Sequence, residues 1–136
     1  MATLLGFDFG LKNIGVACGQ TLTATATPLT TLSAVRQQPD WPGIARLLDE
    51  WQPDALVVGV PLADPGHEDS PLLPRVQRFA RQLEGRFHLP VHLIDERLTT
   101  REAESLLGEQ KYFSSGRIDA LSAALILETW LHENPD

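Results

Sequence analysis

Three carboxylates in this chain interrupt or directly follow apolar segments, which makes them the first candidates for chemistry. Asp8 lies between two Phe residues in the apolar run 4–10. Glu96 follows the apolar run 90–95, and Asp119 lies at the start of an Ala- and Leu-rich segment. Asp is depleted in strands, and an ionised carboxylate near a core is costly unless something compensates it. A divalent cation is one such compensator, so the three acids are candidate metal ligands.

Asp8 and Asp119 also have structural explanations that the sequence leaves open. Asp8 can end its strand in contact with water or cap the turn that follows. Asp119 can favour a helix N-terminus through the helix macrodipole, a contribution of about 0.3–1 kcal/mol. For Asp119 taken alone, the sequence favours the macrodipole explanation over catalysis.

The third acid is ambiguous in the sequence because two acids are adjacent. Asp95 competes with Glu96, since alternation along a strand puts neighbouring side chains on opposite faces. Glu96 can also form an ion pair with Arg97 or Arg101. The residues themselves do not choose among these explanations.

Hydrophobic periodicity and chain breakers predict the elements that must position these acids. Two strands over 3–9 and 13–18 form a hairpin through Gly10–Lys12. Pro28 indicates an edge position or a bulge in a third strand. Further elements are predicted at 21–32, 55–60 and 90–95 as strands, and at 42–51, 73–87, about 100–108 and 117–132 as helices.

This order predicts an α/β fold with a mixed five-stranded sheet, three antiparallel strands and then two parallel ones, flanked by helices. The crossovers bring the fourth and fifth strands beside the first. The ends of the first and fifth strands and the start of the last helix then converge. Acids gathered there suit one or two Mg²⁺ or Mn²⁺ ions, which in pairs support in-line cleavage of a phosphodiester.

Size and composition indicate one ordinary domain spanning residues 1–136, of which 43% are hydrophobic. No apolar stretch approaches the roughly 20 residues of a membrane span, and no signal peptide is evident. Cys18 is the only cysteine and lies in an apolar strand. We therefore expect a reduced core cysteine and a cytoplasmic protein with no membrane partner.

A net charge of −7 argues against sequence-blind binding of nucleic acid, but the basic residues are not evenly spread. Six of the eleven Lys and Arg residues are Arg75, Arg78, Arg81, Arg86, Arg97 and Arg101. For Arg75, Arg78 and Arg86 of the 73–87 helix we expect a solvated face, with an electrostatic track for nucleic acid as the alternative. A further prediction is that the segment Tyr112–Gly116 is a mobile loop that gates access to the site.

Four segments together carry a resemblance to a known family. They are the hairpin 6–17, Val58–Pro61, Asp95–Thr100 and Arg117–Leu127. In order, spacing and chain length they are similar to the YqgF/RuvX family of Holliday junction resolvase-like and pre-16S rRNA nuclease proteins. The resemblance covers essentially the whole chain.

This resemblance implies an RNase H-like fold and a metal-dependent nuclease with Asp8, Glu96 and Asp119 as ligands. It favours Glu96 over Asp95. One departure concerns the first hairpin, where family members commonly carry a Lys-Arg pair and this chain has Lys12-Asn13. The change removes a positive charge that would face phosphate and leaves the acids intact.

The predicted function is cleavage of structured nucleic acid with Mg²⁺ or Mn²⁺, and the resemblance points to the 5′ end of pre-16S rRNA. Lys12, Arg97 and Arg101 lie beside the acids in sequence and are the candidate phosphate contacts. Resolution of branched DNA is the enzymatic alternative and requires a homodimer, whereas rRNA cleavage is compatible with a monomer. A non-catalytic nucleic-acid-binding or ribosome assembly factor is the alternative from another class.

Overall fold

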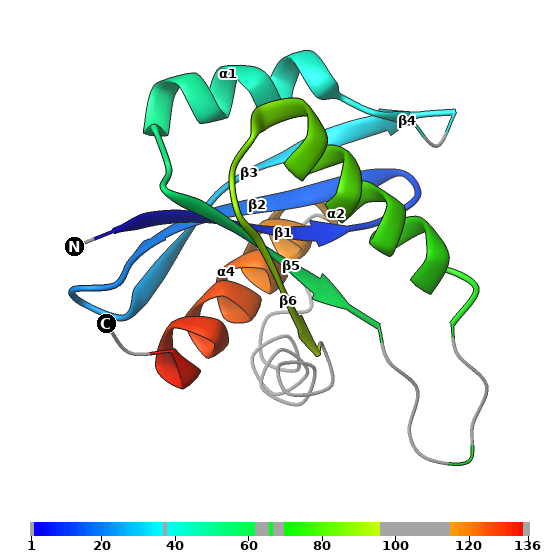
Figure 1. Ribbon diagram of the computed structural model, residues 1–136. Helices are drawn as coiled ribbons and strands as arrows, with labels where there is room; N and C mark the ends of the chain where they lie inside the picture. Colours follow the sequence, from blue (N-terminus) through cyan, green and yellow to red (C-terminus); the bar gives the residue numbers. More distant parts are fainter. Residues whose placement is uncertain (1, 37, 62–65, 67–69, 96–114, 135–136) are drawn as a thin grey trace.

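The computed structural model describes residues 2–36, 38–61, 66, 70–95 and 115–134. Its elements, drawn in Figure 1, are β1 (Thr3–Phe9), β2 (Asn13–Gln20), β3 (Thr25–Val35), β4 (Gln38–Pro39), α1 (Trp41–Trp51), β5 (Ala55–Val60), α2 (Leu73–Phe87), β6 (Val91–Asp95) and α4 (Ser115–Glu133). The predicted strands at 3–9, 13–18, 55–60 and 90–95 are confirmed within two residues. The predicted helices at 42–51, 73–87 and 117–132 are likewise confirmed.

The strands form one mixed sheet in the order β4-β3-β2-β1-β5-β6. β1 pairs antiparallel with β2 and parallel with β5, and β5 pairs parallel with β6. The predicted strand arrangement is correct except for one added strand, β4, which pairs two residues with the end of β3. A two-residue strand is too short to produce a period, so the sequence pattern could not reveal it.

β3 differs from its predicted bounds at both ends. Residues 21–24 form a turn, in which Ala24 has a φ of 52°. The strand then runs on to Val35. Val16 pairs with Thr30 while Ala17 pairs with Pro28, so the ladder shifts register at this point. Pro28 therefore lies at a bulge, as its missing N–H predicts.

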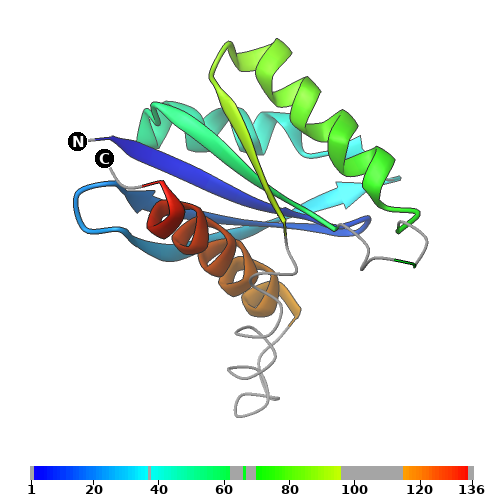
Figure 2. The same ribbon diagram turned by 60° about the horizontal axis from the view of Figure 1, so that its bottom comes forward.

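Helices cover both faces of the sheet. Figure 2 shows α1 and α2 on one side and α4 on the other. On the first side, Phe7 and Phe9 of β1 pack on Phe79 of α2, with ring centroids 5.8 and 5.0 Å apart. Trp41 of α1 stacks on the same Phe79 at 5.6 Å. These aromatic contacts join α1 and α2 to the centre of the sheet.

Local signals explain where α1 begins and ends. The Asp40 side chain accepts a hydrogen bond from the Gly43 N–H at 3.0 Å, and Pro42 lies in the first turn. Gln52 adopts a left-handed conformation at the C-terminus and directs its N–H to the Leu48 carbonyl. Pro53 then prevents the helix from continuing.

The predicted capping box at 99–102 and the helix after it lie outside the described residues, as do residues 112–114 of the predicted loop. Its last two residues, Ser115 and Gly116, belong to α4, so the loop prediction is wrong there. Ser is favoured at helix starts, and one Gly costs only about 1 kcal/mol, which packing of a long helix offsets. No described helix is long and apolar enough to cross a membrane.

Candidate active site

Asp8 faces α4 at the carboxyl end of β1. Along β1, Phe7 and Phe9 pack against α2, so the intervening side chains point to the other side of the sheet. Gly6 confirms this direction, because a Cβ atom built there would lie 2.7 Å from the Leu127 Cβ of α4. Asp8 is half-buried on this α4 side.

Asp119 lies beside Asp8 because of a glycine on the neighbouring strand. Gly15 of β2 pairs with Asp8, and directly opposed residues of an antiparallel pair share a face. A Cβ atom at Gly15 would lie 1.9 Å from the carbonyl oxygen of Asp119. The backbone of Asp119 therefore rests on Gly15, and the structure brings two of the three predicted acids to one place.

Small side chains allow α4 to approach the sheet this closely. Ala17 of β2 is buried against Ala123 and Ala124 of α4. At Gly19, a Cβ atom would lie 3.0 Å from side-chain atoms of both Leu127 and Leu131. Without side chains to separate them, the helix backbone can lie directly on the strands, which positions Asp119.

The structure also bears on the alternative explanation of Asp119. α4 begins at Ser115 and has no acidic residue in its first turn, so Asp119 lies beyond the region where the macrodipole acts strongly. The preference of the sequence for the macrodipole explanation is therefore wrong. Burial raises the pKa of the Asp119 carboxyl by desolvating its charged form. A cation beside this carboxylate would offset that cost.

Of the two adjacent acids at the end of β6, Asp95 belongs to the face opposite Asp8. His92 stacks on Trp130 of α4 with ring centroids 4.8 Å apart, and Ile94 is buried with residues of α4. Leu93, between them, lines a groove with Ala80 of α2. Alternation therefore assigns Asp95 to the α2 side. Glu96 lies outside the described residues.

The predicted phosphate contacts are only partly described. Lys12 is exposed in the hairpin between β1 and β2, and its carbonyl accepts a 2.8 Å hydrogen bond from the Ala34 N–H. This contact holds Lys12 at the same edge of the sheet as Asp8. Gly10 is needed in the hairpin, since a Cβ atom there would lie 2.6 Å from the Asn13 carbonyl oxygen. Arg97 and Arg101 lie outside the described residues.

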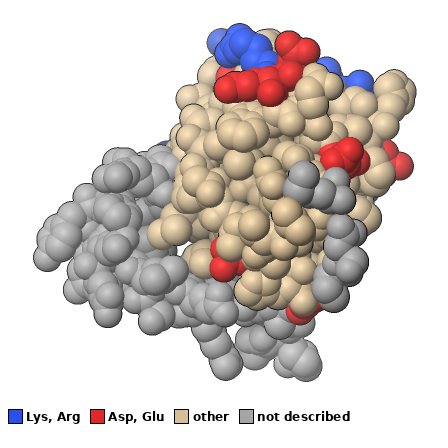
Figure 3. Space-filling model, turned by 90° about the vertical axis from the view of Figure 1, so that its left-hand side faces the viewer, with Lys and Arg blue, Asp and Glu red and all other residues tan. Residues whose placement is uncertain are grey.

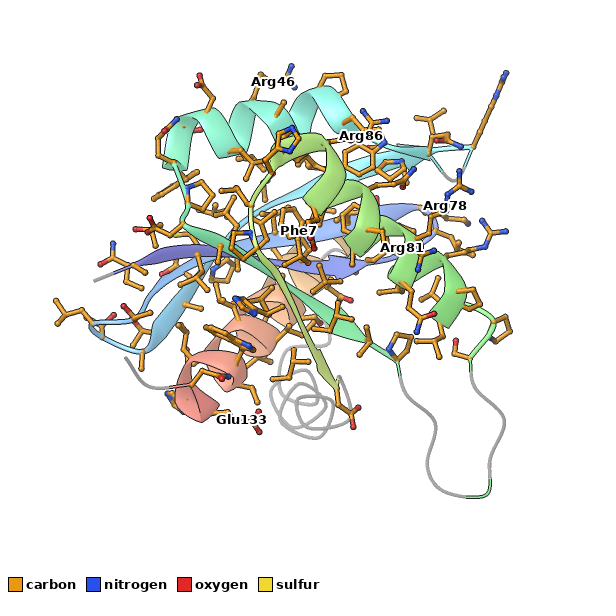
Figure 4. All side chains as sticks on the ribbon, in the orientation of Figure 1. Phe7, Arg46, Arg78, Arg81, Arg86 and Glu133 are labelled. Carbon is orange, nitrogen blue, oxygen red and sulfur yellow. The ribbon has the colours of Figure 1, made fainter. Side chains whose placement is uncertain are left out.

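The arginines of α2 are solvent-exposed, as predicted, but their surroundings differ. They are Arg75, Arg78, Arg81 and Arg86. The guanidinium carbon of Arg86 lies 4.3 Å from the ring centroid of Trp41, a cation–π contact that supports the α1–α2 packing. In Figure 4, Arg86 lies near α1, whereas Arg78 lies farther along α2, towards its N-terminal end.

Among the residues that the structure describes, no three His, Cys, Asp or Glu side chains form a group suited to a metal ion. Asp8 and Asp119 supply two members of the predicted set, and the third member is outside the described ranges. Sequence reasoning missed Gly15 as the residue that joins them. Its only signal was a glycine inside an otherwise apolar strand, which often marks close backbone approach.

Two comparisons with known sequences agree along nearly the whole chain. The family model RuvX, described as Holliday junction resolvase, matches residues 2–133. A relative from Haemophilus ducreyi is 49% identical over 136 residues, covering 98% of each chain. One from Azotobacter vinelandii is 50% identical over 135 residues, covering 97% of this chain and 94% of the relative. Both relatives are named "Putative pre-16S rRNA nuclease".

Solved structures share the fold at low sequence identity. T. thermophilus RuvC in complex with a Holliday junction substrate has a TM-score of 0.55 at 16% identity, covering 98% of this chain and 97% of that one. The fowlpox virus Holliday junction resolvase has a TM-score of 0.56 at 10% identity, covering 96% and 99%. These likenesses confirm the expected RNase H-like fold class. Since a family model and full-length relatives match the segments that carry Asp8 and Asp119, the chain belongs to the RuvX family.

Proposed function

We propose that this protein is a metal-dependent nuclease that processes the 5′ end of pre-16S rRNA. The observation that carries the proposal is the contact of the Asp119 backbone with Gly15, which holds Asp119 beside Asp8 at the carboxyl end of β1. Two acidic residues from distant parts of the chain are thereby brought to the same end of the sheet. The name of the 49% identical relative supports pre-16S rRNA as the substrate.

The residues at this position fit Mg²⁺ or Mn²⁺. Asp8 and Asp119 offer carboxylate oxygens, the ligands that hard divalent cations prefer. Desolvation raises the pKa of Asp119, so a neighbouring positive charge would stabilise its ionised form. We assign Glu96 as the third ligand, because β6 directs Asp95 to the other face. The bound cation would supply Lewis-acid stabilisation of the charge that develops on the phosphate.

The chain's own basic groups would hold the substrate against these acids. Lys12, at the same edge of the sheet as Asp8, would donate charge-assisted hydrogen bonds to phosphate oxygens. Arg97 and Arg101, which follow Glu96 in the sequence, would contact phosphate oxygens in the same way. Such contacts orient the nucleic acid but carry no information about its sequence. The half-burial of Asp8 and Asp119 would limit competing water.

Resolution of branched DNA is the second candidate function, favoured by the description of the RuvX family and by the fold shared with resolvases. It requires two sites related by two-fold symmetry and therefore a homodimer. A protein that stays monomeric when saturated with a four-way DNA junction, by light scattering, would exclude this candidate. Cleavage of pre-16S rRNA makes no such demand.

We further propose that residues 1–136 act as one nuclease domain in the cytoplasm. The family model spans 2–133, which supports a single unit. The one cysteine of the chain, Cys18, is free and half-buried, and disulfides are rare in proteins of reducing compartments.

Cleavage of labelled RNA and DNA tests the proposed function. The substrates are the 5′ leader of pre-16S rRNA and a four-way DNA junction, each with Mn²⁺ or Mg²⁺. We expect Asp8→Asn to lower the cleavage rate by roughly 100-fold or more, since it removes a charged ligand. Asp49→Asn is the matched control, because Asp49 is exposed on α1. Equal cleavage by native protein and Asp8→Asn would contradict the assignment and point to a contaminant or a different site. No cleavage by the native protein would leave a non-catalytic binding factor as the explanation.

A further inference from the structure

A small cavity at the carboxyl end of β1 is lined by arginines from two separate elements. Its volume is about 110 Å³. Arg36 comes from the turn between β3 and β4, and Arg75 and Arg78 come from α2. Phe9 and Phe79 also line it, and Gln82 adds an amide. This volume equals that of roughly three to four waters, which suits a small anion.

The chemistry of the lining favours a phosphate group. Arginine presents several N–H donors in a fixed planar fork that matches phosphate oxygens. Phe9 and Phe79 are buried, and apolar groups beside a charge strengthen its interactions by excluding water. None of the described residues that line this cavity is acidic. The cavity therefore concentrates positive charge in a protein whose net charge is −7.

The backbone of Arg36 is a second, independent observation. Val35 and Gln38 are paired, so Arg36 belongs to the two-residue turn of a hairpin. Its φ is 53°, in the left-handed region that Gly and Asn prefer at this position. A non-glycine residue in such a conformation costs on the order of 1 kcal/mol, and such residues cluster at functional sites. An arginine held here at that cost presents its charge to the cavity.

The cavity lies at the same edge of the sheet as the candidate active site. Phe9, in its lining, follows Asp8 directly and faces the opposite side of the sheet. The hydrogen bond between the Lys12 carbonyl and the Ala34 N–H ties the β1–β2 hairpin to the strand that leads to Arg36. Figure 1 shows this hairpin and β4 at one end of the sheet.

The described surface at the opposite end of the molecule and the other arginines of α2 offer less positive charge. At the other end of the molecule, Figure 3 shows a face that is mostly neither basic nor acidic, with basic atoms gathered mainly along its top, where α1 lies. On α2, Arg86 is engaged with Trp41. Arg81 lines different grooves, in which Glu84 offsets its charge. The three arginines that line the cavity, Arg36, Arg75 and Arg78, form a basic cluster at the carboxyl end of β1.

We propose that this cluster binds a backbone phosphate of the nucleic acid substrate, at a position outside the cleaved bond. The inference rests on the proposed nuclease function and extends its binding site around the edge of the sheet. Nucleic acid held at Asp8 and Lys12 would continue past the end of β1 to Arg36 and Arg78. The cluster positions the substrate and does not touch the reacting phosphate.

Binding of a fluorescein-labelled RNA hairpin from the pre-16S rRNA leader tests this inference. Anisotropy in EDTA, at KCl concentrations from 50 to 200 mM, keeps binding separate from cleavage. The double variant R36Q/R78Q should bind roughly five- to tenfold more weakly. The slope of log Kd against log salt concentration should be smaller for this variant by about 0.7–0.9. That is the contribution of one phosphate contact. The control R46Q/R81Q removes two positive charges outside the cavity, and its salt dependence of Kd should match that of native protein.

Kinetics distinguish positioning from chemistry. With Mn²⁺, R36Q/R78Q should raise KM and leave kcat within about twofold of native, and R36K/R78K should recover part of the affinity. A lowered kcat at unchanged KM would contradict the positioning role. Native Kd and salt slope in R36Q/R78Q would overturn the inference outright.

Inorganic phosphate distinguishes the two sources of the anion. A titration followed by ¹⁵N NMR should shift the resonances of Arg36 and Gln82, at concentrations that also weaken RNA binding. Phosphate binding with unchanged RNA affinity would overturn the inference in favour of a free-anion site. Because RNA binding is measured without metal, an absence of cleavage by the native protein would refute the nuclease proposal alone.

Discussion

Asp8 and Asp119 are half-buried acidic residues near one end of the sheet. Asp8 interrupts the apolar run of β1, and the backbone of Asp119 rests on Gly15, the residue that pairs with Asp8. Burial raises the pKa of the Asp119 carboxyl, so ionisation of this group costs more in the folded protein than in the unfolded chain. A residue retained at such a cost is expected to serve function more than folding.

Asp119→Asn should therefore inactivate the protein without destabilising it. A raised folded-state pKa means that Asp119 stabilises the fold below the pKa of the unfolded chain, and this contribution is lost as pH rises through the folded-state pKa. At pH 7 without metal, we expect the melting temperature of Asp119→Asn to equal or exceed that of native protein. Scanning calorimetry in EDTA, with Asp49→Asn as control, measures this difference.

Addition of Mg²⁺ should reverse the order of the two melting temperatures. A cation that binds the folded state raises its stability by mass action, and only the native protein keeps both carboxylates. A metal-free Asp119→Asn protein that melts well below native would contradict the account of Asp119.

Cys18 provides a test of burial that is independent of the site. Desolvation raises the pKa of its thiol, and the thiolate is the nucleophile. We expect iodoacetamide at pH 8 to alkylate native Cys18 at least about tenfold more slowly than the urea-unfolded chain, as followed by mass spectrometry. A native rate equal to the unfolded rate would refute the core position of this cysteine.

At the scale of elements, the contact between α4 and the β1–β2 hairpin decides the geometry of the site. Gly6, Gly15 and Gly19 leave no side chain where the helix rests. The apolar run in the sequence reveals α4. A glycine inside a strand can mark close approach of another backbone, but it does not indicate which segment approaches. For this reason the position of Asp119 over Gly15 could not be predicted.

Gly15→Ala should damage both stability and activity. Its Cβ would lie 1.9 Å from the Asp119 carbonyl oxygen, so α4 must move. We expect a loss of about 2–3 kcal/mol in the free energy of unfolding, by urea titration, and a large loss of cleavage while the protein is still folded. The matched control is Gly85→Ala in α2, where no atom lies within 4 Å, and it should stabilise by about 0.5–1 kcal/mol. Equal stability of the two variants would refute the close contact.

The end of β6 illustrates what periodicity alone leaves open. Alternation predicts that Asp95 and Glu96 point to opposite faces of the sheet. It does not assign either residue to a face unless the orientation of another residue of the strand is known. The stacking of His92 on Trp130 and the burial of Ile94 supply that reference. Both contacts join segments distant in the chain, so they become available only with the fold.

At the scale of the whole molecule, charge distribution matters more than net charge. A total of −7 would suggest weak interaction with nucleic acid. Yet Lys12, Arg36 and Arg78 gather near one end of the sheet. The sequence indicated a basic segment, whereas the contribution of Arg36 depends on a turn beside the two-residue strand β4, which no sequence pattern indicated.

Fold class was predictable because long periodic segments alternate in type, and the order of strands and helices leaves few topologies. The three candidate acids stood out as exceptions to those same patterns, and their role as metal ligands stays a prediction. What joins them, a glycine beneath a helix backbone, is a property of packing. The proposed metal centre depends on that packing and on the third acid, Glu96.

Diffraction from crystals soaked in Mn²⁺, collected at the manganese absorption edge, tests the central proposal most directly. We predict an anomalous peak within coordination distance of carboxylate oxygens from Asp8, Glu96 and Asp119, and no such peak in Asp8→Asn crystals. The proposal would be contradicted if native crystals showed no manganese at this position and the three side chains pointed into separate surroundings.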